Sequence, residues 1–248
     1  MELEVTLTTI FVASLVTAVA TGLGALPFLF TRDFSRRWLG IFSAIAAGLM
    51  LSASHGLISA GEQRNAWFVV LGMVIGLVLV VLADRWVSGR ETPEIADLDG
   101  VDARKALLLL GVMTAHSFAE GIGVGVAYGG GSQLGGLITL AIAVHNVPEG
   151  LAISLVLVPR GTSVARAAAW SVVSSLPQPL MAVPAYLFVT TFQPFLPVGM
   201  GLAAGAMIWL VFSELVPDSL EHLSTSAAAT AVTLAFLGMM VVQMLLEG

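Results

Sequence analysis

Long apolar runs dominate the chain, and charged residues or clusters of glycine and proline separate each run from the next. Most runs have about 20 residues, the length that an α-helix needs to cross the hydrocarbon core of a bilayer. Their polarity does not alternate, so the strand pattern of a membrane barrel is not supported. We therefore predict an all-α integral membrane protein with eight transmembrane helices, at about residues 6–30, 38–60, 66–83, 106–128, 134–158, 167–189, 197–216 and 225–246.

The first apolar run carries no charge between Glu4 and Arg32. It is too long for the core of a signal peptide and lacks a basic start, so we expect a retained membrane helix. A more polar loop interrupts the pattern at about residues 86–105. Its carboxylates fit a solvated cytosolic linker, with weak metal capture as the alternative; they are Glu91, Glu94, Asp97, Asp99 and Asp102. Residues 1–248 are predicted to form a single eight-helix transmembrane domain, with no separate soluble domain.

Basic residues decide the predicted orientation, because the cytoplasmic loops of membrane proteins are enriched in lysine and arginine. Eight helices place both termini on the same side of the membrane. Among the ten basic residues, Arg64 alone falls on that side. The other nine fall on the opposite side: Arg32, Arg36, Arg37, Arg85, Arg90, Arg104, Lys105, Arg160 and Arg166. These nine are therefore predicted to face the cytosol, and both termini are predicted to be extracytoplasmic.

Composition excludes most other classes of protein. Hydrophobic residues make up 57% of the chain and charged residues only 10%, whereas soluble domains carry roughly 25% charged residues. The net charge of −6 offers no basic surface for nucleic acid. Cysteine is absent, which excludes disulfides, thiolate metal sites and cysteine nucleophiles. We expect a multi-pass protein of the cell membrane, plasma or inner, that contacts the lipid bilayer and has no nucleic-acid partner.

Two short motifs each occur twice, on predicted helices of opposite direction. Residues 116–121 (HSFAEG) resemble residues 145–150 (HNVPEG), and residues 46–50 (AAGLM) resemble residues 203–207 (AAGAM). Opposed repeats of this kind indicate an inverted-topology transporter, with its site near the middle of the membrane. For the second pair, close packing of small residues is an equal alternative.

The first repeat contains two His-x-x-x-Glu units, His116 with Glu120 and His145 with Glu149. Residues four apart lie on one face of a helix, so each unit can offer an imidazole and a carboxylate to the same point. Ionisable side chains inside a membrane helix are costly and indicate function. Two nitrogens and two carboxylates suit Zn²⁺, and also Fe²⁺ or Mn²⁺. We predict a metal site between the fourth and fifth helices; helix-joining His–Glu hydrogen bonds are the alternative.

Further polar residues lie near these motifs in the sequence. Asn146 can lend an amide oxygen, Ser117 is a weaker ligand, and the thioether of Met50 can meet a soft metal or simply pack. Gln178 lies between two prolines, which open a polar gap in the sixth helix. We expect these four residues at or beside the metal site.

The seventh predicted helix ends in a group of carboxylates and one imidazole, with Glu214, Asp218 and His222 as the main members. Because this end is predicted to face the cytosol, it can form an exit site for metal. An ordinary solvated helix end is the alternative. His55, nearer the outer face, can be an outer ligand or a packing residue.

These residues predict a carrier of divalent transition-metal ions rather than an enzyme. An intramembrane metalloprotease would need a His-Glu-x-x-His motif, which the chain lacks. A metal-permeable channel is the alternative of another class, although inverted repeats favour a carrier. The His/Glu ligands admit Zn²⁺, Cd²⁺, Fe²⁺ and Mn²⁺, and we expect zinc first. The transported metal is a substrate, so no cofactor is expected.

Paired His-x-x-x-Glu-Gly motifs on the fourth and fifth of eight helices resemble those of the ZIP (Zrt/Irt-like) metal transporters, in particular the prokaryotic GufA-like branch. The segment from His145 to Gly150 carries the most specific likeness, and the resemblance covers essentially the whole chain. It implies metal ligands at His116, Glu120, His145 and Glu149, with Met50 at the edge of the site. It also implies that metal enters the cytoplasm and that both termini lie outside.

The sequence departs from this resemblance where bacterial relatives can hold a second, adjacent ion. Ser117 takes the place of an amide, Gln178 takes the place of a glutamate, and Ala119 replaces a proline. The resemblance together with these departures predicts one tightly bound ion rather than two. The sequence does not decide the oligomeric state, for which a homodimer is one option.

Overall fold

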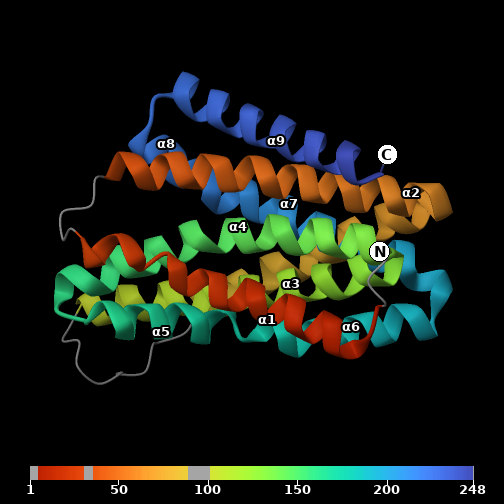
Figure 1. Ribbon diagram of the computed structural model, residues 1–248, viewed down its shortest axis with the longest axis horizontal. Helices are drawn as coiled ribbons and strands as arrows, with labels where there is room; N and C mark the ends of the chain where they lie inside the picture. Colours follow the sequence, from red (N-terminus) through yellow and green to blue (C-terminus); the bar gives the residue numbers. More distant parts are fainter. Residues whose placement is uncertain (1–4, 31–35, 89–100, 248) are drawn as a thin grey trace.

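The computed structural model describes residues 5–30, 36–88 and 101–247. All regular structure in these residues is helical, which confirms the predicted all-α class. The long helices run along the longest axis of the molecule (Figure 1). The α-helices of the described residues are α1 (Leu7–Leu23), α2 (Arg36–Ser88), α3 (Val101–Gly130), α4 (Ser132–Leu157), α5 (Val164–Ser175), α6 (Pro177–Thr191), α7 (Leu196–Leu210), α8 (Val216–His222) and α9 (Thr225–Glu247). Short 3₁₀ turns lie at Leu26–Leu29, Val158–Arg160 and Gln193–Phe195.

Six stretches of the described residues are long and apolar enough to cross a membrane. They are Leu7–Leu29, Arg36–Arg85, Ser132–Leu157, Val164–Thr191, Gln193–His222 and Thr225–Leu245. These stretches agree with the predicted multi-pass helical membrane protein, whereas the predicted number of eight spans stays a prediction.

α2 contains the second and third predicted spans with no loop between them. Its regular geometry is interrupted only at Asn65, where φ is −164° and ψ is 104°. The Asn65 side-chain oxygen accepts a hydrogen bond from the backbone N–H of Phe68 at 3.2 Å. An asparagine oxygen that bonds the N–H three residues on is a typical N-cap. Asn65 therefore ends one helical segment and starts the next.

Irregular backbone interrupts two of the other predicted spans, in each case shortly before a proline. The sixth divides at Leu176 into α5 and α6, because Pro177 has no N–H to continue the hydrogen-bond ladder. In the seventh, the stretch Val211–Leu215 is a π-helix between α7 and α8. Pro217 follows it and cannot donate to the carbonyl four residues earlier, and its ring would clash there in a regular helix. The wider π turn relieves that conflict.

The helices extend further than the apolar runs. Helical backbone extends into both ends of the loop predicted at about residues 86–105, since α2 continues to Ser88 and α3 begins at Val101. Hydropathy marks the membrane-embedded part of a helix, whereas helical backbone can continue past it. Of the carboxylates predicted in this loop, Asp102 falls on α3, and the others lie outside the described residues.

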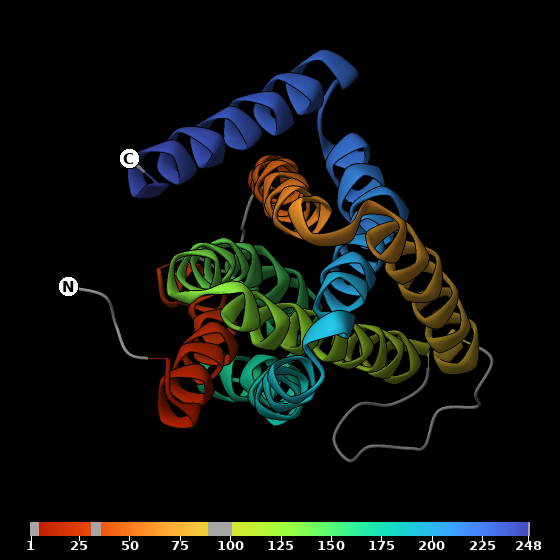
Figure 2. The same cartoon turned by 90° about the vertical axis from the view of Figure 1, so that its right-hand side faces the viewer.

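The helices form two groups, which lie side by side in Figure 2, where the view is down the long axis of the molecule. One group contains α1, α3, α4, α5 and α6, and the other contains α2, α7, α8 and α9. Glycines bring backbones together within each group. A Cβ added at Gly125 of α3 would lie 2.1 Å from the carbonyl oxygen of Ala182 in α6, and one added at Gly201 of α7 would lie 2.1 Å from that of Val69 in α2. Close glycine-mediated approach is a common way to pack membrane helices.

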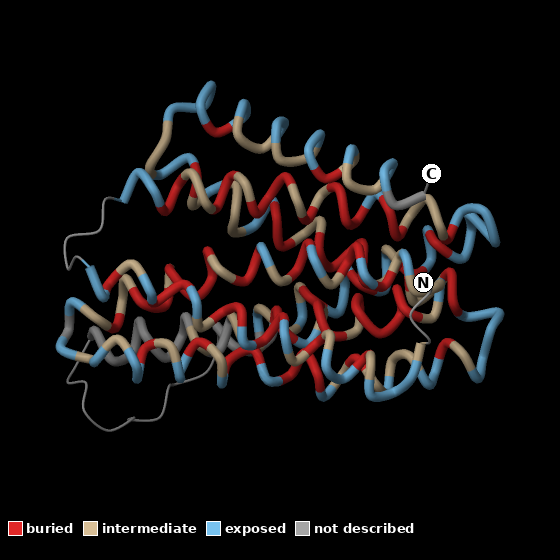
Figure 3. The backbone as a smooth tube through the Cα atoms, viewed as in Figure 1, coloured by how far each residue is buried: buried red, intermediate tan, exposed pale blue. Residues whose placement is uncertain are grey.

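Burial differs strongly between helices (Figure 3). In the most apolar stretch of α4, 61% of the residues are buried, against 11% in α9. α4 therefore lies at the centre of the protein and α9 at its periphery. The helix that carries the second His-x-x-x-Glu unit is thus enclosed by its neighbours.

Candidate metal centre

The two His-x-x-x-Glu units lie on antiparallel neighbours, α3 and α4, which pack against each other. In each unit the four-residue spacing places the imidazole and the carboxylate on one face of the helix. All four side chains are at least 94% buried; they are His116, Glu120, His145 and Glu149. The predicted convergence of the two motifs is therefore present in the structure.

His145 and Glu149 form the centre of the cluster. Nε2 of His145 lies 3.1 Å from Oε1 of Glu149 and 3.2 Å from Oε1 of Glu120. Nδ1 of His116 lies 3.9 Å from the same Glu149 oxygen. One ligand atom from each of Glu120, His145 and Glu149 fits within a 4.8 Å group, which is close enough for all three to reach one ion.

Several buried polar atoms near this cluster have no hydrogen-bond partner among the described residues. They are Oε2 of Glu149, Nδ1 of His145, Oδ1 of Asn146 and Oγ of Ser117. Buried polar atoms in folded proteins are nearly always paired. The unpartnered Glu149 oxygen, inside a cluster of nitrogen and oxygen donors, fits a site that binds a cation.

Glu214 belongs to this cluster, although the sequence placed it only at the inner mouth. Its Oε1 lies 2.9 Å from Nε2 of His116. Glu214 is in the π-helical stretch Val211–Leu215, and π turns often occur at functional sites. The imidazole of His116 thus links Glu149 in one helix group to Glu214 in the other.

A cavity of about 170 Å³ opens beside the cluster. Its lining includes His116, His145, Glu149, Glu214 and Asp218. Met50 also lines it and is fully buried, so the thioether lies at the edge of the site. The cavity leads toward α8, where Asp218 accepts a hydrogen bond from the hydroxyl of Ser43. Ligand atoms of Asp218, Glu221 and His222 also lie within 4.8 Å of one another.

A second cavity, of about 830 Å³, lies at the opposite end of the molecule. Its lining includes His55, Arg64, Ser132, Leu137 and Met200. His55 is exposed there, with its ring edge-on to Phe236 at a centroid distance of 6.4 Å.

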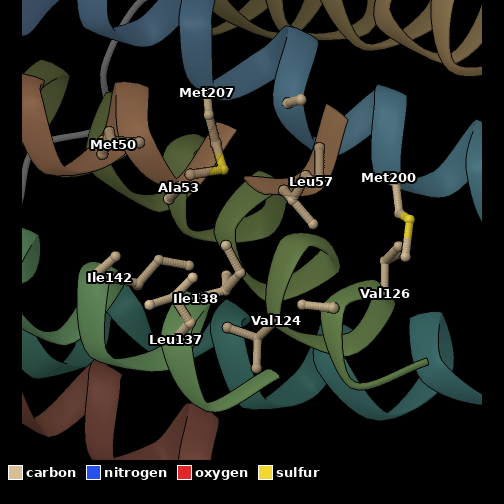
Figure 4. Close-up of a cluster of buried hydrophobic side chains, with 14 of the residues drawn as sticks. Met50, Ala53, Leu57, Val124, Val126, Leu137, Ile138, Ile142, Met200 and Met207 are labelled. Atoms are coloured by element: carbon tan, nitrogen blue, oxygen red, sulfur yellow. The ribbon is translucent and has the colours of Figure 1, made fainter. Parts of the chain in front are cut away.

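An apolar cluster lies between this outer cavity and the metal cluster. Figure 4 shows Met50 and Met207, from α2 and α7, on one side of it and Ile138 and Ile142, from α4, on the other. Leu137 borders the outer cavity, and His145 follows it by eight residues on α4. At 1.5 Å per residue, the apolar layer is about 12 Å thick.

Behind the cluster, Gln178 joins three helices through hydrogen bonds. Its Nε2 donates to Oε2 of Glu120 at 2.6 Å. Its Oε1 accepts from the hydroxyl of Thr17 at 2.5 Å and from Nδ2 of Asn146 at 3.2 Å. Gln178 and Asn146 were expected beside the site from the sequence, whereas Thr17 was not, because α1 carries several hydroxyl side chains and no pattern distinguishes Thr17 among them.

A model of the ZIP zinc-transporter family matches residues 88–246, which is more than half of the chain. The chain belongs to the ZIP family. The matched region contains both His-x-x-x-Glu units, Gln178 and Glu214, and the match confirms the resemblance inferred from those units.

Three relatives illustrate how far the likeness to known ZIP proteins extends. The zinc transporter GufA of Myxococcus xanthus is 32% identical over 224 residues, which cover 84% of this chain and 87% of GufA. The zinc transporter ZIPB of Bordetella bronchiseptica is 34% identical over 239 residues, which cover 89% of this chain and 76% of ZIPB. A protein of Arabidopsis thaliana that is named as a zinc transporter is 44% identical over 98% of this chain, and this chain spans 40% of its length.

Membership of the ZIP family and the several apolar helices agree with the sequence interpretation of a multi-pass membrane transporter. ZIP proteins are transporters rather than enzymes. The GufA-like branch is supported by the match to GufA along most of both chains.

Proposed function

We propose that this chain transports divalent transition-metal ions, with zinc as the first substrate, into the cytoplasm. His116, Glu120, His145 and Glu149 are the proposed ligands in the membrane-embedded site. The observation that carries the proposal is the convergence of two imidazoles and two carboxylates, at least 94% buried, between α3 and α4. The names of the relatives support zinc as substrate.

The chemistry of the cluster suits a borderline divalent ion. Imidazole nitrogen and carboxylate oxygen both bind Zn²⁺ well, and they also accept Fe²⁺, Mn²⁺ or Cd²⁺. Two ionised glutamates balance the charge of one divalent ion, so the loaded site carries little net charge. Charge balance matters here because an uncompensated charge at low dielectric is very unfavourable.

The arrangement of cavities supports a path toward the end of the molecule where α8 meets α9. The inner cavity joins the cluster to Glu214 and Asp218, which we propose as exit ligands together with His222. Arg36, Arg37, Arg85 and Arg166 lie at helix ends on this side, and we propose that this side faces the cytosol. In this proposal eight helices cross the membrane, with Asn65 at the outer turn.

The apolar layer favours a carrier over an open channel. It contains fully buried side chains such as Met50, Ile138 and Met207, and it lies between the outer cavity and the metal cluster. Ions that pass an open channel need a continuous polar path. A carrier instead exposes its site to one side at a time, and this structure fits the form that is open on the inner side.

Transport by purified protein in liposomes tests the proposal directly. Zn²⁺, Cd²⁺, Fe²⁺ and Mn²⁺ are supplied outside, and uptake is followed for each ion. We expect saturable uptake, with the highest ratio of maximal rate to KM for Zn²⁺. Uptake no faster than in protein-free liposomes would contradict the proposal.

The orientation is tested by labelling single cysteines, since the chain has none of its own. Ser132, at the turn between α3 and α4, and Thr162, before α5, lie at opposite ends of the molecule. We expect a thiol reagent that does not cross membranes to label Ser132→Cys in intact cells, and Thr162→Cys only after permeabilisation. The reverse pattern would overturn the proposed orientation and the assignment of an exit site.

The stoichiometry of tight binding is expected to be one ion per chain. Two divalent ions about 4 Å apart would repel strongly, since even single charges at that distance interact by about 4 kcal/mol at an effective dielectric of 20. The neutral amide of Gln178 does not offset that repulsion, whereas Gln178→Glu adds a carboxylate beside Glu120. Metal analysis after removal of loosely bound ions should therefore give one ion for the unmutated chain and more for Gln178→Glu. Two ions in the unmutated chain would contradict the charge argument.

A further inference from the structure

We propose that Thr17 of α1 is a positioning residue for the metal ligand Glu120 and acts on it through the amide of Gln178. This inference rests on the proposed function, because it concerns the same site. Thr17, Gln178 and Glu120 lie on three different helices, and all three are fully buried. The series of contacts begins at the backbone carbonyl oxygen of Thr17, which can only accept a hydrogen bond, and ends at the carboxylate of Glu120, which faces His145.

The first step fixes the amide of Asn146. Its Nδ2 lies 2.7 Å from the backbone carbonyl oxygen of Thr17. A carbonyl oxygen can only accept a hydrogen bond, so the amide must present its NH₂ group to α1. The same NH₂ group lies 3.2 Å from the side-chain amide of Gln178.

The second step fixes the amide of Gln178. Because Asn146 presents a donor, Gln178 must present its oxygen on that side, which turns its NH₂ group toward Glu120. The resulting hydrogen bond, from Nε2 to Oε2 of Glu120, measures 2.6 Å. A short bond from an amide to a carboxylate is charge-assisted and stronger than one between neutral groups.

The third step is the hydroxyl of Thr17, which also contacts the backbone carbonyl of Ser14 at 2.7 Å. A hydroxyl carries a single proton. If that proton pointed at Ser14, the oxygens of Thr17 and Gln178 would face each other at 2.5 Å without a proton between them. If it pointed at Gln178 alone, the same would hold for the oxygens of Thr17 and Ser14 at 2.7 Å, so the proton is shared between the two acceptors, with the shorter contact toward Gln178. Thr17 thereby holds the oxygen end of the amide while Glu120 holds the nitrogen end.

For the metal site, the consequence is that one oxygen of Glu120 accepts a hydrogen bond from Gln178, which keeps the other oxygen directed at His145. Oε2 accepts from Gln178, and Oε1 faces Nε2 of His145 at 3.2 Å. In this arrangement Gln178 orients a ligand from behind, and both of its amide atoms have protein partners. Partners of this kind fix the orientation of metal ligands, and their removal typically lowers metal affinity by roughly 10- to 100-fold.

Thr17→Val tests the inference, because valine keeps the size and shape of threonine and removes the hydroxyl. Thr21→Val is the matched control. Thr21 lies one turn further along α1, is equally buried, and its hydroxyl is 2.8 Å from that of Ser175, outside the contacts to Glu120. Thr17→Ser is the conservative variant that restores the hydroxyl. Each protein is purified and titrated with Co²⁺, whose visible absorption reports both its affinity and its coordination geometry.

We expect Thr17→Val to bind Co²⁺ about tenfold more weakly and to change the absorption bands, and to raise the KM for zinc uptake with little change in maximal rate. Thr21→Val and Thr17→Ser should bind Co²⁺ with an affinity within about twofold of that of the unmutated protein. Gln178→Met, which removes both polar atoms of the amide, is the second variant and should weaken Co²⁺ binding at least as much.

Two results separate this inference from the proposed function. If the unmutated chain binds Co²⁺ and transports zinc, and Thr17→Val matches Thr21→Val in affinity and spectrum, the positioning role is overturned alone. If Thr17→Val is not recovered as folded protein, unchanged Co²⁺ binding by Gln178→Met overturns it instead. An unmutated chain that neither binds Co²⁺ nor transports zinc would overturn the proposed function and this inference together.

Discussion

Glu149→Gln is expected to lower zinc uptake at subsaturating concentration by about a hundredfold or more. One oxygen of Glu149 contacts His145 at 3.1 Å and lies 3.9 Å from His116, and the other is buried without a partner among the described residues. The glutamine keeps the shape of the side chain but removes half of the negative charge that balances the ion. Leaving a buried charge without its partner typically costs about 3–5 kcal/mol, which is about two to four powers of ten in binding.

The liposome uptake assay measures this effect, with Glu62→Gln as the control. Glu62 is exposed on α2 and lies outside both clusters of possible metal ligands, so its substitution should leave uptake within about twofold, as for an exposed charge in high dielectric. Glu120→Gln should lower zinc uptake about as much as Glu149→Gln, because the carboxylate of Glu120 contacts the same nitrogen of His145. Uptake near the unmutated level in both Glu149→Gln and Glu120→Gln would exclude the proposed site.

Gly150→Ala is expected to prevent recovery of folded protein. A Cβ at Gly150 of α4 would lie 1.6 Å from the carbonyl oxygen of Thr21 in α1. The obstacle is backbone rather than the end of a flexible side chain, so the two helices would have to separate. Overpacking of a well-packed core costs about 1–3 kcal/mol, and more where nothing can yield. The shift would also displace Glu149, the preceding residue.

Gly136→Ala is the matched control, since Gly136 lies on the same helix and nothing lies within 4 Å of a Cβ added there. Its thermal stability in detergent should equal or slightly exceed that of the unmutated protein, because alanine favours helix over glycine by about 1 kcal/mol. Monodisperse Gly150→Ala protein with an unchanged melting temperature would contradict the close approach of α1 and α4.

Much of the fold and the grouping of the four central side chains could be predicted because they depend on patterns within single helices. Uninterrupted apolar runs indicate spans, and a four-residue spacing places His145 and Glu149 on one face. The repeat of that spacing at His116 and Glu120 indicates that two helices contribute to one site. These patterns depend on local geometry, which neighbouring segments hardly alter.

The remaining features depend on contacts between distant segments or on irregular backbone. Glu214 reaches His116 through a π turn that hydropathy does not indicate, so the sequence placed it at the mouth rather than at the site. Thr17 looks like any hydroxyl residue in an apolar helix until Gln178 is packed against it. Asn65 replaces an expected loop because its own side chain caps the next helical segment. In each case tertiary structure decides the role of a residue whose local sequence is ordinary.

The glycines of α3 give this helix two mechanically different faces. Added Cβ atoms at Gly121 and Gly125 would lie 2.5 and 2.1 Å from backbone oxygens of α6, whereas one at Gly123 would lie 3.6 Å or more from side-chain atoms of Ala203 and Met207 in α7. Interlocked backbones resist shear, since neither can move without a clash, while side chains in ordinary van der Waals contact can exchange neighbours. Near Gly123 the contact between α3 and α7 is therefore made by side chains that can rearrange, and a displacement of α3 there would move His116 and Glu120 relative to Glu214.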